Sequence, residues 1–225
     1  MTLEQMGPQE IERRSMEIIE EELRAMGPLP PADRLAVVKR VIHTTADFDY
    51  RDSLFFSPGA VAAGVEAMRA GAWIVTDTNM AKAGVNKAAL EKLGGRVLCF
   101  MAEDRVARTA KERGITRASV SMEAAAELDT AGTPLILAVG NAPTALIRAW
   151  ELLAEGQLSP ALVIGAPVGF VHVAESKELW LEAPCPRIIA RGRKGGSTVA
   201  AAILNALLYE AAGRNLGKKK EGKGV

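Results

Sequence analysis

His43 is one of two histidines in the 225-residue chain, and Arg40 lies three residues before it. Histidine is the side chain that most readily gains or loses a proton near neutral pH. Residues three apart project from the same face of a helix, so we expect the imidazole beside the guanidinium. This spacing indicates an acid/base group next to an anion-binding group, although an ordinary amphipathic helix would show the same pattern. Asp47 and Asp49 follow, and they either orient the imidazole or simply end the helix.

A second candidate is the glycine-rich segment RGRKGGS at 191–197, which carries Arg193, Lys194, Gly195 and Gly196. A glycine-rich turn that enters a helix presents free backbone N–H groups and a positive dipole end to an anion. The basic side chains strengthen the attraction for carboxylate or phosphate. The alternative is a loop that uses glycine only to turn. The segment lacks P-loop spacing, and neither a G-x-G-x-x-G nor a G-x-S-x-G motif follows a strand, which argues against nucleotide binding and serine hydrolysis.

The elements that must position these residues alternate between helices and strands. Apolar spacing predicts helices over 8–26, 32–46, 57–70, 80–93, 103–113, 143–155 and 197–212. Short apolar runs predict strands over 73–76, 96–100, 135–139, 162–164 and 187–190, with 53–56 as an additional edge strand. These runs are apolar throughout, which is typical of strands covered on both faces. The order predicts an α/β fold with a mainly parallel sheet and helices on both faces. In such a sheet ligands bind beyond the carboxyl ends of the strands.

The composition is that of an ordinary globular domain, with 48% hydrophobic and 24% charged residues. The net charge of +1 argues against broad nucleic-acid binding, and no apolar run approaches the roughly 18 residues that span a membrane. Cys99 and Cys185 form no C-x-x-C pair and indicate a reducing compartment, so we expect a cytoplasmic protein. No zinc-ligand spacing is present. We expect one domain over 1–216 and a disordered Lys-rich tail over 217–225.

Segments along the whole chain resemble the precorrin-8X methylmutase family of corrin biosynthesis. In family order between residues 10 and 210 they are IERRSMEII, RVIHTTADFD, TDTNMAKAGVNK, GITR, VGNAPTAL, GAPVGFVHVAESKE and GRKGGSTVAAAILNALLY. The resemblance implies a Rossmann-like fold, a homodimer with active sites near the subunit interface, and a corrinoid substrate. It implies an isomerase of vitamin B12 biosynthesis that moves one methyl group from carbon eleven to carbon twelve of the ring. The TTADFD run after the histidine resembles the anaerobic branch, in which cobalt-precorrin-8 becomes cobyrinic acid.

The resemblance also implies roles for individual residues. His43 is expected as the acid/base residue, and Ser15 and Arg40 are expected to contact the substrate. Ser15 lies on the apolar side of the first predicted helix. Arg117, in GITR, is expected to bind a substrate carboxylate. The arginine, lysine and glycines of 193–196 keep the anion-binding role that their own chemistry indicates.

No cofactor or protein-bound metal is expected, because a methyl shift within one molecule needs no methyl donor and any cobalt belongs to the substrate. Asn79 and His172 receive no role. One alternative is a metal-free precorrin-8X methylmutase of the aerobic branch, and another is a corrinoid carrier without catalysis. A nucleotide- or phosphate-binding module would rest on GRKGGS alone.

Overall fold

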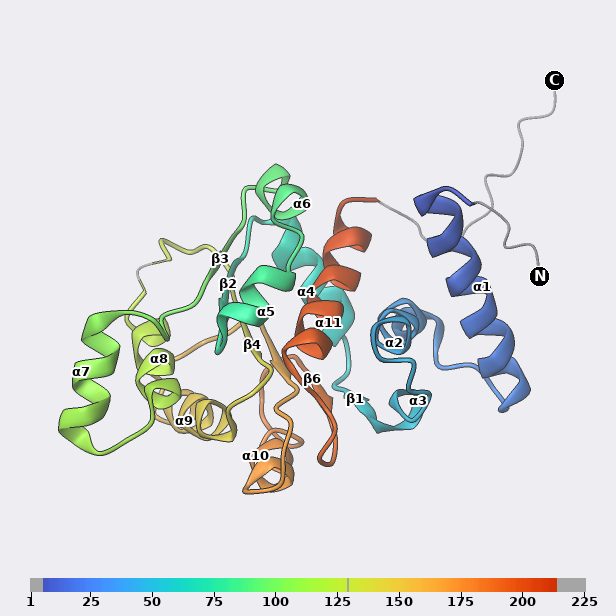
Figure 1. Cartoon of the computed structure of the whole chain (residues 1–225). Coiled ribbons are helices and arrows are strands. Elements are labelled where there is room, and N and C mark those ends of the chain that lie inside the picture. Colours follow the sequence, from blue (N-terminus) through green and yellow to red (C-terminus); the bar gives the residue numbers. More distant parts are fainter. Residues whose placement is uncertain (1–5, 129, 214–225) are drawn as a thin grey trace.

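The architecture is given by a computed structural model that describes residues 6–128 and 130–213 (Figure 1). Within these residues one sheet has the strand order β1-β6-β5-β4-β2-β3. β1 pairs antiparallel with β6, and the other neighbours are parallel. The strands are β1 (Leu54–Phe56), β2 (Trp73–Thr76), β3 (Arg96–Leu98), β4 (Leu135–Val139), β5 (Leu162–Gly165) and β6 (Arg187–Ala190). The predicted mainly parallel, Rossmann-like α/β fold is confirmed. The tail predicted over 217–225 lies outside the described residues.

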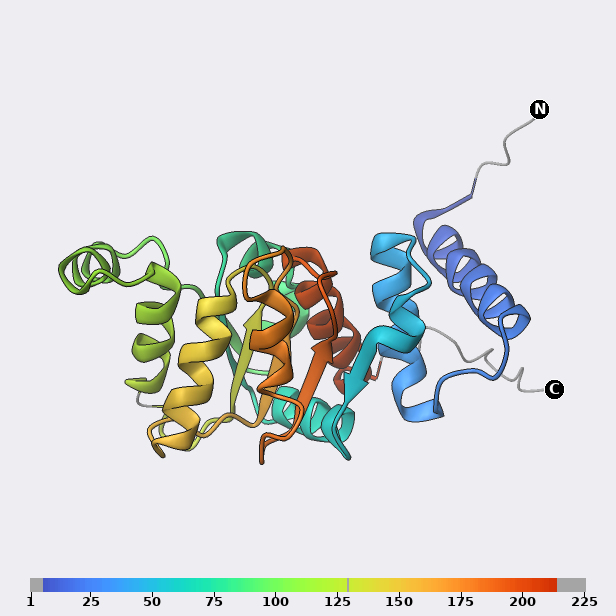
Figure 2. The same cartoon turned by 90° about the horizontal axis from the view of Figure 1, so that it is seen from below.

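Helices cover both faces of the sheet (Figures 1 and 2). One face carries α2 (Ala32–Thr45), α4 (Ala60–Arg69), α5 (Asn79–Gly84), α6 (Lys87–Lys92) and α11 (Ser197–Ala211). α1 (Pro8–Ala25) packs on the outer side of α2, and α3 (Tyr50–Ser53) joins α2 to the edge strand β1 (Figure 2). The other face carries α7 (Asp104–Arg113), α8 (Arg117–Ala126), α9 (Pro143–Ala154) and α10 (Val173–Glu178).

The sheet has one apolar core on each face. Successive side chains of a β-strand point to opposite faces, so alternate strand residues belong to different cores. In β4, Ile136 and Ala138 belong to the core beneath α11, whereas Leu137 and Val139 belong to the core beneath α9. All five residues of this strand are buried. The uninterrupted apolar runs of the sequence therefore reflect burial on both faces.

Three local predictions need correction. The helix predicted over 80–93 is divided into α5 and α6, because the Asn86 side chain accepts the Ala89 N–H at 3.1 Å and caps a new helix. Helices α3, α8 and α10 were not predicted, and Ser53, placed in the edge strand predicted over 53–56, is the last residue of α3. The apolar stripe assigned to α1 is only partly buried, since Ile11, Ile18 and Met26 remain exposed.

Candidate active site

The crevice where ligands bind in open α/β sheets is filled here by the chain itself. The strand order reverses between β2 and β4, which defines that crevice. Asp77, fully buried just after β2, accepts the backbone N–H groups of Gly140, Asn141 and Ala142 at 2.8, 2.8 and 2.7 Å. Burial raises the pKa of the Asp77 carboxyl, and the three N–H donors oppose that rise. Because these three N–H groups already bind the Asp77 carboxylate, they are not available to an external anion.

Replacing Asp77 by Ala should lower the free energy of unfolding by about 3 kcal/mol, because the turn loses the acceptor for three N–H groups. Urea unfolding followed by circular dichroism measures the change. Asp77→Asn keeps one acceptor oxygen and should lie between the two proteins. An Ala variant within about 0.5 kcal/mol of wild type would show that this contact does not stabilise the fold.

His43 and Arg40 occupy the last turns of α2. The imidazole is exposed, whereas Arg40 is only 9% exposed. One terminal nitrogen of Arg40, Nη1, donates to Glu12 Oε1 of α1 at 2.8 Å, and the guanidinium stacks over the Tyr209 ring at 5.2 Å. The other, Nη2, is buried and has no hydrogen-bond partner within the described residues. The guanidinium is thus held in place with one buried donor unused, which a carboxylate could satisfy only after the side chains around it move.

Ser15 lies on α1, one turn beyond the glutamate that binds Arg40. Residues three apart share a helix face, so the Arg40–Glu12 ion pair places this serine on the side of α1 that meets α2. Its hydroxyl donates to the Ile11 carbonyl at 2.8 Å, and the residue is half-buried rather than inward-facing. The hydroxyl oxygen can still accept a hydrogen bond from a ligand.

The glycine-rich loop between β6 and α11 reaches the end of α2 through an ion pair. Lys194 Nζ lies 2.6 Å from Asp47 Oδ2 and 2.5 Å from Asp49 Oδ2. The Lys194 hydrogen bond lowers the pKa of the Asp47 carboxyl, and the two carboxylates raise the pKa of Lys194. The ammonium predicted to bind a ligand anion is thus occupied by these carboxylates. The structure brings two segments 147 residues apart together, four residues beyond His43.

Gly195 and Gly196 lie close against the segment that follows β5. A Cβ at Gly195 would lie 2.3 Å from the Ala166 carbonyl oxygen and 2.6 Å from that of Pro167, so only glycine fits against the loop after β5. Gly196 has a φ of 129° and donates its N–H to the Ala166 carbonyl at 2.8 Å. The prediction that this N–H is free for an anion is therefore wrong.

Arg193, in the same loop, is exposed and stacks over the Phe170 ring at 5.4 Å. Phe170 is 81% exposed, and the neighbouring Val171 is exposed as well. Together these side chains give this part of the surface an apolar character. His172 follows them, exposed, with a left-handed φ of 57°. An apolar tip with an arginine against it was not predicted from the sequence.

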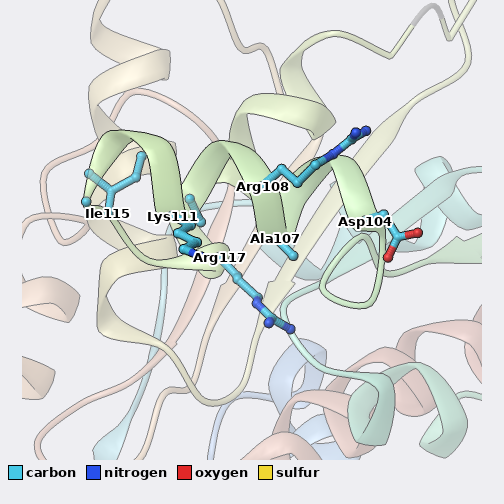
Figure 3. Close-up of a pocket in the computed structure, with 8 residues that line it drawn as sticks. Asp104, Ala107, Arg108, Lys111, Ile115 and Arg117 are labelled. Atoms are coloured by element: carbon cyan, nitrogen blue, oxygen red, sulfur yellow. The ribbon is translucent and has the colours of Figure 1, made fainter.

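Arg117 stands apart from these residues. It begins α8, on the face of the sheet opposite α2, and is exposed beside a groove of about 770 Å³ (Figure 3). Arg108 and Lys111 of α7 line the same groove. Within one chain the structure does not bring Arg117 to His43, because α8 and α2 lie at opposite ends of the molecule (Figures 1 and 2).

Lys177 is a further residue that sequence reasoning missed. It lies in α10, is 1% exposed, and donates from Nζ to the carbonyls of Gly192 and Lys194, each at 2.8 Å. Burial lowers its pKa to about 8. Since both acceptors are backbone groups far along the chain, no residue type or spacing near Lys177 could have indicated the contact.

Two findings concern metals and membranes. Among the described residues, no three His, Cys, Asp or Glu side chains lie close enough together to hold a metal ion. In the same part of the chain, no helix is both long and apolar enough to cross a bilayer.

Together, these features define an α/β protein whose acid/base and cationic side chains lie at the flank of a sheet with a filled crevice. The family model described as precorrin-8X methylmutase matches residues 10–210. The chain belongs to the precorrin-8X methylmutase family and is an intramolecular methyl-shifting isomerase of vitamin B12 biosynthesis.

Relatives with assigned activities agree with this membership. A cobalt-precorrin-8 methylmutase of Priestia megaterium is 46% identical over 201 residues, covering 89% of this chain and 87% of the relative. A precorrin-8X methylmutase of Pseudomonas aeruginosa is 43% identical over 204 residues, covering 90% and 95%. The crystal structure of precorrin-8x methyl mutase from Thermus thermophilus superposes with a TM-score of 0.82 at 41% identity, covering 91% of this chain and 97% of that one.

Proposed function

We propose that the protein converts cobalt-precorrin-8 to cobyrinic acid by shifting one methyl group from carbon eleven to carbon twelve of the macrocycle. The observation that carries this proposal is the pair formed by exposed His43 and buried Arg40, whose Nη2 is unpartnered within the described residues. The pair offers a proton donor beside a fixed cation, and a relative 46% identical carries the corresponding name.

The reaction needs no external atoms. The bond from the methyl carbon to carbon eleven breaks as its bond to carbon twelve forms, and the double bonds of the ring shift to compensate. Protonated His43 donates to a ring nitrogen, which draws electron density from the conjugated system, and the imidazole takes the proton back afterwards. Because donor and acceptor of the methyl group are one molecule, we propose that the enzyme works without a cofactor and without a metal of its own.

The surroundings of His43 fit a corrinoid. Such a molecule combines a broad apolar ring with several carboxylates, so it calls for both kinds of contact. Arg40 supplies a buried guanidinium, and Arg193 supplies an exposed one. Phe170 and Val171 supply an exposed apolar surface next to Arg193. We propose that the carboxylates meet these arginines while one ring face covers the apolar side chains.

Spectra of the purified protein under anaerobic conditions test the substrate assignment. With cobalt-precorrin-8 we expect conversion to the cobyrinic acid chromophore. The relative from Pseudomonas aeruginosa, at 43% identity, favours metal-free precorrin-8X as the second candidate. Turnover of the metal-free compound at a higher kcat/KM would replace the first proposal by the second. Binding of both compounds without conversion would instead favour a carrier.

A homodimer in the cytoplasm is the assembly we propose, with Arg117 of the partner subunit completing each site. Within one chain Arg117 lies across the sheet from His43, yet the family resemblance implies substrate contacts for both. Apolar side chains left exposed on α1 beside Ser15, namely Ile11 and Ile18, are suited to being covered by a second copy.

Mixed dimers should regain activity if the site is shared. His43→Asn and Arg117→Glu each impair every site of their own homodimers. A mixed dimer places both changes in one site and leaves the other intact. Random mixing makes about half of the dimers mixed, so about a quarter of all sites should be active. Kinetic assay after refolding the two variants together measures the recovery. Activity no higher than that of the separate variants would place Arg117 outside the shared site.

A further inference from the structure

Lys177 is a buried cation held only by backbone oxygens. Its side chain is enclosed beneath the loop between β6 and α11, and its Nζ donates to the Gly192 and Lys194 carbonyls at 2.8 Å. Within the described residues no carboxylate lies in ion-pair range of this nitrogen. Taking an ammonium out of water without a counter-ion is costly. A neutral residue at this position would avoid that cost. What Lys177 provides in return is its two hydrogen bonds to the loop backbone.

The two acceptors lie on either side of Arg193. Anchoring the carbonyls of Gly192 and Lys194 to one nitrogen fixes the backbone on both sides of this arginine. Gly169 adds a third backbone contact, because its N–H donates to the Arg193 carbonyl at 3.3 Å. The buried Lys177 and the backbone of Gly169 therefore fix the directions in which the side chains of Arg193 and Lys194 project from the loop.

The same loop holds the end of α2. Lys194 is fixed at its carbonyl by Lys177 and binds Asp47 and Asp49 with its ammonium. Asp47 comes directly after Ala46, whose left-handed φ of 54° ends α2 three residues beyond His43. A displacement of the loop would therefore move the residues that fix the orientation of the last helical turn.

We propose that Lys177 is a positioning residue for the methyl shift, which acts through the loop backbone and Lys194 on the placement of His43. This inference rests on the activity proposed above. The hydrogen bonds and the ion pair from which it is argued are independent of that activity. The link has two steps, a pair of backbone hydrogen bonds and one ion pair. If the link exists, the effects of substituting Lys177 and Lys194 on kcat/KM should not be independent of each other.

A double-mutant cycle on kcat/KM tests the link. Lys177→Met removes both hydrogen bonds at nearly constant volume, and Lys194→Met removes the ion pair with Asp47 and Asp49. Each should lower kcat/KM by about 10- to 100-fold, because displacing a reacting group by 1 Å costs up to 10²-fold. The kcat/KM of the double variant should be no more than about threefold below that of the less active single variant. Multiplying effects would overturn the proposal, since the residues would then act independently.

Arg187→Met is the matched control. Arg187 is also a buried cation whose hydrogen bonds go to backbone carbonyls, in its case those of Leu181, Ala183 and Cys185. Its loss should lower the Tm as Lys177→Met does. Its effect on kcat/KM should multiply with that of Lys194→Met. If Arg187→Met showed the same coupling to Lys194, the effect would be general loosening rather than positioning.

The imidazole signals provide a readout that needs no substrate. With two histidines in the chain, His172→Asn assigns both sets of NMR resonances. Lys177→Met should move the His43 resonances, and Lys194→Met should move them in the same direction. Unchanged His43 signals in a folded Lys177→Met protein would overturn the inference, whether or not the substrate is correctly assigned. If the Met variant does not fold, Lys177→Gln takes its place. Its shorter side chain should reach at most one of the two carbonyls, so we expect changes in the same directions.

Discussion

Asparagine in place of His43 should lower kcat by about 10²- to 10⁴-fold and leave the dissociation constant for the substrate within a few-fold of wild type. In the mechanism proposed above, the imidazole acts in the transition state and the cationic groups bind the carboxylates, so we expect the loss to be confined to kcat. His43 is exposed in the last turn of α2, so its replacement creates neither a cavity nor an unpaired buried group. Single-turnover spectra separate binding from conversion.

His172→Asn is the control for this experiment, since it removes the other imidazole by the same substitution. His172 is exposed and has a left-handed φ, which asparagine tolerates well. We expect kcat within a factor of three of wild type. Should His43→Asn also keep its kcat, the proton would have to come from another group. If instead neither wild type nor variant turned over while both bound, the protein would be a carrier.

Alanine at Gly195 should reduce kcat/KM by about 10²-fold or more. The added methyl group would meet the Ala166 carbonyl oxygen at 2.3 Å and the Pro167 carbonyl oxygen at 2.6 Å, and neither is the end of a flexible side chain. The loop must therefore move away from the segment after β5. That movement carries Arg193 and Lys194 with it, so the proposed substrate contact of Arg193 and the ion pair of Lys194 with Asp47 and Asp49 are disturbed together. Steady-state kinetics and the Tm measure the two consequences.

Gly192→Ala is the comparison within the same loop. Gly192 has a φ of 70°, but nothing lies within 4 Å of the position that a Cβ would take. We expect a backbone strain of about 1 kcal/mol and a fall in kcat/KM of less than tenfold. Equal losses in the two variants would attribute the effect to glycine conformation rather than to the close approach of the Gly195 backbone to the Ala166 carbonyl.

The strands and most helices were predictable because their signals are local. Runs such as LILAV at 135–139 are apolar at every position, and only strands buried on both faces combine such runs with short length. α8 was missed because its buried side consists largely of alanine and serine, which gives a weak apolar period. α10 has six residues, too few to show a period of 3.6. The break between α5 and α6 depends on Asn86, whose N–H also binds Asn205 of α11.

The candidate site also has a part that local sequence predicts and a part that it does not. The placement of His43 and Arg40 in one helix was predictable, because their spacing along the sequence is itself the signal. The partners of Lys194 were not, because Asp47 and Asp49 lie 147 and 145 residues away along the chain. Lys177 binds carbonyl oxygens, which every residue possesses, so sequence carries no trace of the contact. The glycines were noticed, but their φ angles and close approaches had to come from the fold.

Asp77 has a consequence for the shape of ligand that this scaffold accepts. β2 and β4 are paired neighbours, and neighbouring strands are about 4.7–4.9 Å apart, so the crevice beyond their carboxyl ends admits a narrow chain such as a pyrophosphate but no wide disc. The Asp77 carboxylate binds the N–H groups at that crevice, so the surface left for a wide ligand is the rim around it. A disc lying flat on a rim has one side uncovered. In the dimer proposed above, the second copy of the chain would cover that side.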